Sequence, residues 1–141
     1  MAIRNANAQW NGDLKGGKGR MTLGSGTWEG QYSFSSRFEE GTGTNPEELI
    51  AAAHAGCFSM ALSNILAGAG HKPDSVRTSA KVHLEMGEDG PSIPRIELET
   101  EAVVPGLDDA EFQAHAEAAK KGCPVSKVLS AAEISLQATL K

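Results

Sequence analysis

The chain has 141 residues, a length typical of one compact domain, so we expect a single domain over residues 1–141. Thirteen Lys and Arg against eighteen Asp and Glu give a formal net charge of -5, and neither sign forms a long block, which argues against binding to nucleic acid. Hydrophobic residues make up 40% of the chain, so disorder of the whole is excluded, and a chain of this length needs no disulfide or structural metal for stability.

The first ten residues, MAIRNANAQW, lack the long apolar run of a secretory signal, so we expect a cytoplasmic protein. Residues 49–70 carry no charged side chain apart from His54, and by length they could cross a bilayer. Most of them are Ala and Gly, with Ser59, Ser63 and Asn64 among them, so the segment is only weakly apolar. We interpret it as a helix buried in protein rather than a membrane span.

Seven glycines between residues 8 and 36 separate short strand-like pieces around Trp10, 21–23 and 28–34. This pattern predicts a small β-meander. No GxxxxGK[ST] occurs, and no GxGxxG lies between a strand and a helix, so nucleotide binding has no support from the sequence.

The first long helix is expected to begin after Asn45, a good N-cap, with Pro46 at the first helical position and Glu48 completing a capping box. Ala-rich sequence continues the helix to about Ala67, and the glycines and proline that follow predict its end.

Residues 76–86 alternate apolar and polar side chains, the period expected of a half-buried strand, and residues 96–104 do so again after a turn at 87–91. We predict a long antiparallel hairpin. A second helix is expected from Asp108 and Asp109 to Gly122, and residues 134–140 alternate as a final strand of the sheet. Because the strands come in runs rather than alternating singly with helices, the predicted class is α+β with antiparallel sheets.

Cys57 lies in the middle of the first long helix among small residues. It could be a packed thiol, since cysteine is among the most buried residue types. Burial in apolar surroundings raises the pKa of a thiol, so a reactive Cys57 would need a cationic partner from outside its own helix.

Cys123 lies between Gly122, which ends one helix, and Pro124, which can begin another. Backbone N–H groups at a helix start and three nearby lysines favour a thiolate, so local sequence makes Cys123 the more acidic of the two thiols. The alternative is an ordinary surface cap residue. A metal site formed by His54, Cys57 and Cys123 is a further alternative, but no fourth ligand is evident, and His54 is more often a core or interface histidine.

Four segments together resemble one family: TNPEEL at 44–49, AHAGCFSMA at 53–61, GCPVS at 122–126, and Arg37 within SSRFE at 35–39. They are similar to the OsmC/Ohr hydroperoxide reductases, and to the OsmC subgroup more than to the organic hydroperoxide resistance proteins, because Arg37 lies shortly before the helix. The resemblance covers essentially the whole chain.

The resemblance implies a thiol-dependent peroxidase that reduces organic hydroperoxides, and less well hydrogen peroxide, without metal or other cofactor. It implies an intertwined homodimer in which antiparallel sheets wrap around two central helices, with active sites at the subunit interface. Carried over by motif, Cys57 is the peroxidatic thiol, Cys123 the resolving thiol, Arg37 the activator of Cys57, and Glu47 the residue that holds Arg37. An external dithiol, of lipoyl type in the family, would reduce the disulfide.

Glu47 and Cys57 lie about 15 Å apart along one predicted helix, so they cannot touch directly. Either Arg37 spans part of this gap or a second subunit supplies one of the groups. Simpler roles remain open: Glu47 could stabilise the helix dipole, and Arg37 could be an exposed strand-end cation paired with Glu39 or Glu40.

Apolar residues near the thiol, expected to favour bulky hydroperoxides, are Ile50, Ala53, Phe58 and Ala61. Two functions from other classes remain possible: a module that binds a hydrophobic ligand, and a redox sensor whose disulfide changes an interface.

Overall fold

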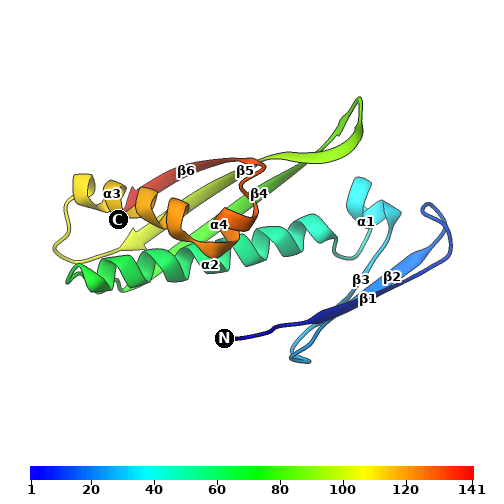
Figure 1. Ribbon diagram of the computed structural model, residues 1–141, viewed down its shortest axis with the longest axis horizontal. Helices are drawn as coiled ribbons and strands as arrows, with labels where there is room; N and C mark the ends of the chain where they lie inside the picture. The colour runs from blue at the N-terminus through cyan, green and yellow to red at the C-terminus, as the bar shows by residue number, and fades with distance from the viewer. The chain divides into compact units, whose positions relative to one another are not determined.

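The computed structural model describes residues 1–141 as two compact units, Met1–Leu49 and Ile50–Lys141. In the first unit, strands β1 (Ala6–Asn11), β2 (Lys18–Leu23) and β3 (Glu29–Tyr32) form an antiparallel sheet in the order β1-β2-β3. The predicted β-meander is confirmed (Figure 1).

Gly19 shows why this meander needs a glycine in a strand. Gly19 is the cross-strand neighbour of both Trp10 and Tyr32, whose ring centroids lie 5.3 Å apart. A Cβ on Gly19 would come within 2.5 Å of the Tyr32 ring and 2.6 Å of the Trp10 ring. The missing side chain therefore lets the two rings lie against the strand.

A short helix, α1 (Phe34–Phe38), replaces the strand end that the sequence suggested here. Ser33 and Ser36 make a reciprocal capping box: the Ser36 N–H donates to Ser33 Oγ at 3.2 Å, and the Ser33 N–H donates to Ser36 Oγ at 2.8 Å. The prediction of extended chain through Phe34 was therefore wrong, and the alternative that Arg37 is a strand-end cation is excluded, because Arg37 lies in α1. The paired serines satisfy the free N–H groups of a helix too short to show a periodic pattern.

Helix α2 runs over Pro46–Gly68, as predicted. Asn45 is the N-cap, because the Glu48 N–H donates to its Oδ1 at 2.9 Å. The expected return bond from the Glu48 side chain is not made: its carboxylate instead accepts a hydrogen bond from Thr44 Oγ1 at 2.7 Å. The cap is thus half of the predicted capping box.

In the second unit, β4 (Ser75–Gly87) and β5 (Gly90–Val103) form the predicted antiparallel hairpin, with Ala80 opposite Leu98. Strand β6 (Glu133–Leu140) lies beside β5 but runs parallel to it, which corrects the expectation of wholly antiparallel sheets. The chain leaves the end of β5, passes through α3 (Asp109–Gly122) and α4 (Pro124–Val128), and returns to the start of the sheet. Such a crossover makes the next strand parallel.

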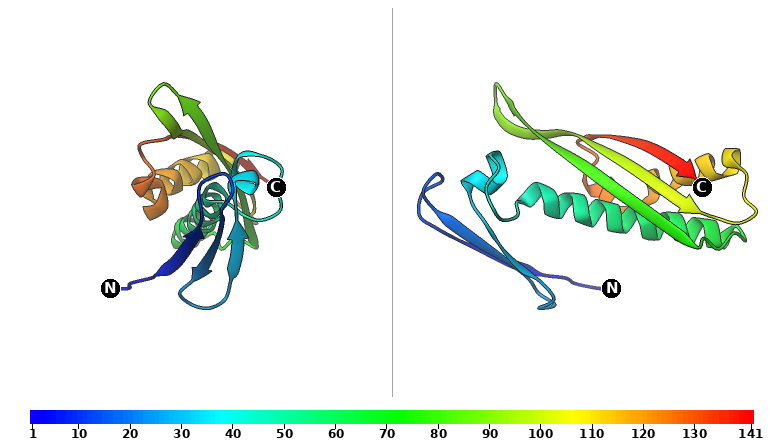
Figure 2. Two further views of the ribbon diagram at one scale, coloured as in Figure 1. Left: turned by 90° about the vertical axis from the view of Figure 1, so that its right-hand side faces the viewer. Right: turned by 180° about the vertical axis from the view of Figure 1, so that it is seen from behind.

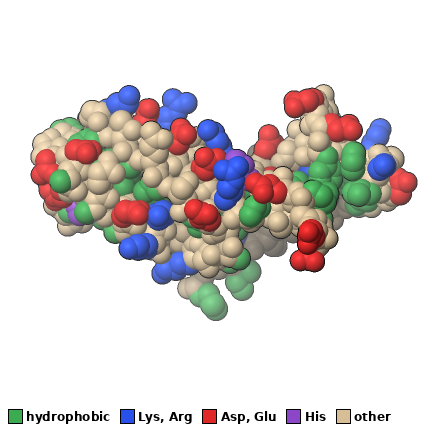
Figure 3. All heavy atoms as spheres, turned by 90° about the horizontal axis from the view of Figure 1, so that it is seen from above, with side chains coloured by type: hydrophobic (Ala, Val, Ile, Leu, Met, Phe, Trp, Pro, Cys, Tyr) green, Lys and Arg blue, Asp and Glu red, His purple; other side chains and the backbone are tan.

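Helix α3 begins after the N-cap Asp108, as predicted, and lies with α2 on one face of the β4-β5-β6 sheet (Figure 2). The core lies between them and includes the following buried residues: Phe58, Leu62 and Leu66 from α2, Leu98 and Ala102 from β5, and Phe112, Ala116 and Ala119 from α3. The class is α+β. Acidic and basic side chains alternate over the other face of the sheet (Figure 3).

Only one stripe of α2 faces this core. The most apolar 18 residues of α2 have a mean hydropathy of 1.5, but only 22% of them are buried within the chain. The helix is therefore less covered than expected of a core helix. By length and composition alone, α2 could also cross a membrane, but core helices of other proteins pass the same test. Much of its Ala-rich surface, with Met60 76% exposed, therefore has no cover within one chain.

Candidate functional site: a thiol pair and an arginine–glutamate pair

Helix α2 holds Cys57 at a fixed place beside the core. Cys57 is half-buried, and the next residue, Phe58, is fully buried. Two residues on, the Ser59 hydroxyl donates to Thr78 Oγ1 at 2.8 Å, and Thr78 contacts the buried Thr100 hydroxyl at 2.9 Å. This chain of hydroxyls ties the helix to β4 and β5 next to the thiol. Because Phe58 points into the core, it does not belong to the apolar mouth that we expected around Cys57.

Cys123 is the residue at which α3 ends and α4 begins. It is the C-cap of α3, with its N–H donating to Ala119 O at 2.9 Å, and the N-cap of α4, with Pro124 at the first helical position. The prediction that Cys123 lies at a helix start is confirmed. The thiol is fully buried, so the alternative of a surface cap residue was wrong.

The two thiols lie close enough for each to shift the pKa of the other. Burial raises the pKa of Cys57, and the hydrogen bond to Cys123 raises it further, against the opposing effect of the Val125 N–H. Burial also acts to raise the pKa of Cys123, but the neighbouring Cys57 thiol and the nearby polar groups of Ser126 and Val125 lower it overall. Within this unit Cys123 therefore loses its proton first, in line with the local sequence.

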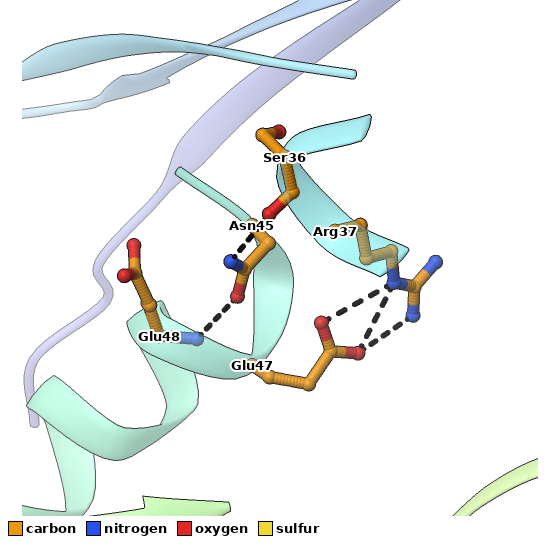
Figure 4. A network of polar contacts seen from close by, with 5 residues as sticks. All are labelled: Ser36, Arg37, Asn45, Glu47 and Glu48. Atoms are coloured by element: carbon orange, nitrogen blue, oxygen red, sulfur yellow. Dashed lines mark hydrogen bonds and ion pairs between the residues drawn. The ribbon is translucent and has the colours of Figure 1, made fainter. Parts of the chain in front are cut away.

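In the first unit, Arg37 from α1 meets Glu47 from the first turn of α2 (Figure 4). The Arg37 Nε donates to both Glu47 oxygens at 3.2 Å, and Nη2 donates to Oε1 at 2.7 Å. The Glu47 side chain is 10% exposed and that of Arg37 is 34% exposed. Glu47 therefore binds Arg37 directly, as its expected role requires. Arg37 makes no ion pair with the alternative partners Glu39 and Glu40.

The neighbouring chain fixes this ion pair in place. Asn45 Nδ2 donates to Ser36 O at 3.0 Å, and Ser36 Oγ donates to Thr44 O at 2.7 Å, so α1 is tied to the start of α2. The guanidinium carbon lies 5.3 Å from the centre of the Phe38 ring. Nη1 makes no hydrogen bond within the chain and points away from Glu47 (Figure 4), which leaves an N–H face able to bind an anion.

His54 and Ser126 form a buried polar pair next to the thiols. His54 lies one helical turn before Cys57, and its Nε2 is 2.6 Å from Ser126 Oγ. Both residues are buried, and Nδ1 of His54 has no hydrogen-bond partner. Sequence reasoning missed Ser126. The sequence feature that could have pointed to Ser126 is its position three residues after Cys123, the N-cap of α4. A polar side chain at this position often lies near the N-cap residue.

No group of three or more His, Cys, Asp and Glu side chains has an arrangement suited to a metal ion. His54 directs Nε2 at Ser126 rather than at a common point with the two sulfurs. The chemistry that the residues present is that of two thiols able to form a disulfide and a cation held by a carboxylate.

The α+β fold, with Cys57 in α2 close to Cys123 at the start of α4, indicates a protein that acts through a pair of thiols. Comparison with known proteins shows to which family it belongs. The family described as OsmC-like protein matches residues 39–138. The chain belongs to this family.

Individual relatives agree with this assignment. The chain is 51% identical over 135 residues to Peroxiredoxin OsmC of Escherichia coli (strain K12), covering 95% of this chain and 94% of that one. It is 35% identical over 89 residues to the organic hydroperoxide resistance protein of Xanthomonas axonopodis pv. citri (strain 306), covering 61% and 59%. The longer and closer match supports the OsmC subgroup.

A solved structure is also similar over its whole length. The organic hydroperoxide resistance protein OhrB of Bacillus subtilis superimposes with a TM-score of 0.69 at 26% identity, covering 97% of this chain and 98% of that one. The OsmC/Ohr-like α+β fold expected for one chain from the family resemblance is confirmed.

The contact between the thiols predicts that a mild thiol oxidant will convert the reduced chain to a Cys57–Cys123 disulfide within one chain. Peptide mapping by mass spectrometry should find the two cysteine peptides joined, and the oxidised protein should run as a single chain on a non-reducing gel. Disulfides only between chains would contradict this geometry.

Proposed function

We propose that this protein reduces organic hydroperoxides to alcohols, using Cys57 as the peroxidatic thiol and Cys123 as the resolving thiol. The observation that carries the proposal is the contact between a half-buried and a fully buried thiol, in a chain related to proteins named for peroxide reduction and organic hydroperoxide resistance. The half-buried sulfur is the one that a substrate can reach, and the buried sulfur is the one protected until it is needed.

The cycle has three steps. The Cys57 thiolate attacks one peroxide oxygen, the O–O bond breaks, and the alkoxide leaves as the alcohol after taking a proton, so that Cys57 becomes a sulfenic acid. The Cys123 thiolate then attacks the sulfenic sulfur, forming the disulfide and releasing hydroxide, which becomes water. An external dithiol, for which the family suggests a lipoyl-type compound, reduces the disulfide by two exchanges and becomes a cyclic disulfide itself.

Arg37 is proposed as the activator of Cys57. Within the second unit the pKa of Cys57 is raised, which is the wrong direction for a nucleophile at neutral pH. A cation beside the sulfur would lower this pKa, and the free N–H face of Arg37 is suited to that role. Glu47 would keep the guanidinium charged and oriented, and the developing alkoxide could use the same N–H groups.

We propose that the active protein is a homodimer with its two sites at the subunit interface. Support comes from α2, whose small apolar residues are widely exposed in one chain although its mean hydropathy is high. A second copy would cover them, and one subunit could supply the Arg37–Glu47 pair to the thiols of either. The dimer, the single functional domain over residues 1–141 and a cytoplasmic location remain predictions.

The first test is turnover of cumene hydroperoxide with a dithiol. Cys57→Ser should abolish turnover, because it removes the nucleophile. Cys123→Ser should permit one oxidation and then accumulate sulfinic acid at Cys57, measured by mass spectrometry. A Cys57→Ser variant with normal activity would refute the proposal, and a wild type that oxidises once but never turns over would indicate a redox sensor instead.

The second test concerns Arg37. Replacing Arg37 by Ala should raise the pKa of Cys57 by about one to two units, and so lower its alkylation rate at neutral pH by roughly tenfold to a hundredfold. The measurement is the alkylation rate against pH.

Arg20→Ala is the matched control, since Arg20 also pairs with a glutamate in the first unit but is 56% exposed. An identical pH profile for Arg37→Ala and Arg20→Ala would exclude Arg37 from activation.

The third test concerns the dimer. Met60→Glu places a charge on the exposed side of α2 and should convert the dimer to a monomer, because an unpaired charge is costly to bury. Met86→Glu is the control, since Met86 in the hairpin is similarly exposed, at 74% against 76%. Light scattering measures the mass, and a dimeric Met60→Glu variant would show that this face is not the interface.

A further inference from the structure

Two aromatic side chains lie next to Arg37 on α1. Phe34 and Phe38 are one helical turn apart, and their ring centroids lie 4.9 Å from each other with the ring planes inclined at 44°. The guanidinium carbon of Arg37 lies 5.3 Å from the centre of the Phe38 ring. The two rings, which we call the aromatic pair, therefore form an apolar surface directly beside the cation.

Phe38 is the only exposed aromatic residue of the chain, with 37% of its surface accessible. A single exposed apolar side chain is common on protein surfaces, so exposure alone does not indicate a site. Phe38 differs from an ordinary surface residue because its ring adjoins a guanidinium group that keeps a free N–H face.

That free face belongs to Nη1 of Arg37. Glu47 accepts hydrogen bonds from Nε and Nη2, and Nη1 points away from the carboxylate (Figure 4). Nη1 is bonded to the same carbon that lies beside the Phe38 ring. An anionic oxygen bound at Nη1 is therefore near enough to the ring for an apolar group on that oxygen to contact it.

An organic hydroperoxide, ROOH, carries these two parts in the order that this surface requires. In the proposed cycle the Cys57 sulfur bonds to the oxygen farther from R, the O–O bond breaks, and R stays on the oxygen that leaves as the alkoxide. The N–H groups of Arg37 would stabilise the charge that develops on this leaving oxygen. The group R is bonded to the same oxygen, so it would lie beside the aromatic pair.

We propose that the aromatic pair binds the organic group of the hydroperoxide, and that Phe38 is the residue through which the site prefers organic hydroperoxides to hydrogen peroxide. This inference rests on the proposed function and deepens it by naming a specificity residue. Phe38 takes part in no bond making or bond breaking. Hydrogen peroxide has no organic group, so it gains nothing from the rings.

This position differs from the apolar mouth that the sequence suggested on α2. Phe58, the largest residue expected there, is fully buried in the core and is not available to a substrate. Phe38 belongs instead to the element that carries Arg37. The cation and the apolar surface therefore come from one short helix, which fixes each relative to the other.

The test compares cumene hydroperoxide, which carries a phenyl group, with hydrogen peroxide on the full-length chain. Phe38→Ala should lower kcat/KM for cumene hydroperoxide about tenfold and leave kcat/KM for hydrogen peroxide unchanged, because only the organic substrate loses an apolar contact. Phe38→Leu should keep most of the preference, because it keeps an apolar side chain of similar reach.

Leu23→Ala is the matched control. Leu23 in β2 is also 37% exposed and lies in the same unit as Phe38. Its replacement should leave the ratio of the two kcat/KM values as in wild type. An unchanged ratio in Phe38→Ala would overturn the proposal, and so would an equal fall of the ratio in Leu23→Ala.

A role of Phe38 in holding Arg37 is separated by a readout that uses no peroxide. The Phe38 ring contacts the guanidinium, and such contacts stabilise a cation's position. The alkylation rate of Cys57 against pH reports the cation at the sulfur, and Phe38→Ala should leave this profile unchanged. A shifted profile with equal losses for both peroxides would overturn the proposal, because Phe38 would then act only through Arg37.

Binding of the product alcohol separates this inference from the proposed function. In chains that carry Cys57→Ser, 2-phenyl-2-propanol should shift the ring proton resonances of Phe38 in the NMR spectrum, and Phe38→Ala should weaken its binding. Absence of a shift at Phe38 would overturn this inference whatever the turnover. Absence of turnover in wild type with any hydroperoxide would refute the proposed function, whereas the binding measurement is independent of that outcome.

Discussion

The proposed chemistry depends on one constraint: two sulfur atoms from distant parts of the sequence must lie side by side in the second unit. Cys57 is held by α2, which packs against the sheet through Phe58, Leu62 and Leu66. Cys123 is held where α3 ends and α4 begins, and α3 packs against the same sheet. Packing of α2 and α3 against the same sheet therefore places the Cys57 sulfur beside the Cys123 sulfur. Neither helix could do this alone.

Electrostatics then decides which thiol ionises. The groups within the second unit favour a thiolate at Cys123, because the Cys57 thiol and the polar groups at the start of α4 lower its pKa. Attack on a peroxide by Cys57 requires the opposite order, so the proposed chemistry depends on a cation delivered from elsewhere. The Arg37–Glu47 pair is suited to this role, because the carboxylate binds the Nε–Nη2 edge of the guanidinium and leaves Nη1 free. Once Cys57 has been oxidised, the acidity of Cys123 becomes an advantage, since the resolving thiol must be a thiolate.

Sequence patterns predicted the elements that have strong local signals. Asn45 and Pro46 located the start of α2, alternation located the hairpin, and Asp108 located the start of α3. Helix α1 was missed because five residues are too few for periodicity, and its stability comes from paired serine caps. The direction of β6 was missed because alternation gives the face of a strand but not the partner beside which it lies.

The site residues also differ in how far the sequence could predict them. The motifs at Cys57 and Cys123 named both thiols, and Arg37 and Glu47 were paired by resemblance, but Ser126 became visible only when α4 brought it against His54. The central claim is that Cys57, not the more acidic Cys123, captures the peroxide oxygen. It is tested most directly by treating reduced wild-type protein with one equivalent of organic hydroperoxide, trapping the sulfenic acid with a dione and mapping the adduct. We predict the adduct on the peptide that contains Cys57; an adduct on the peptide that contains Cys123 would contradict the account.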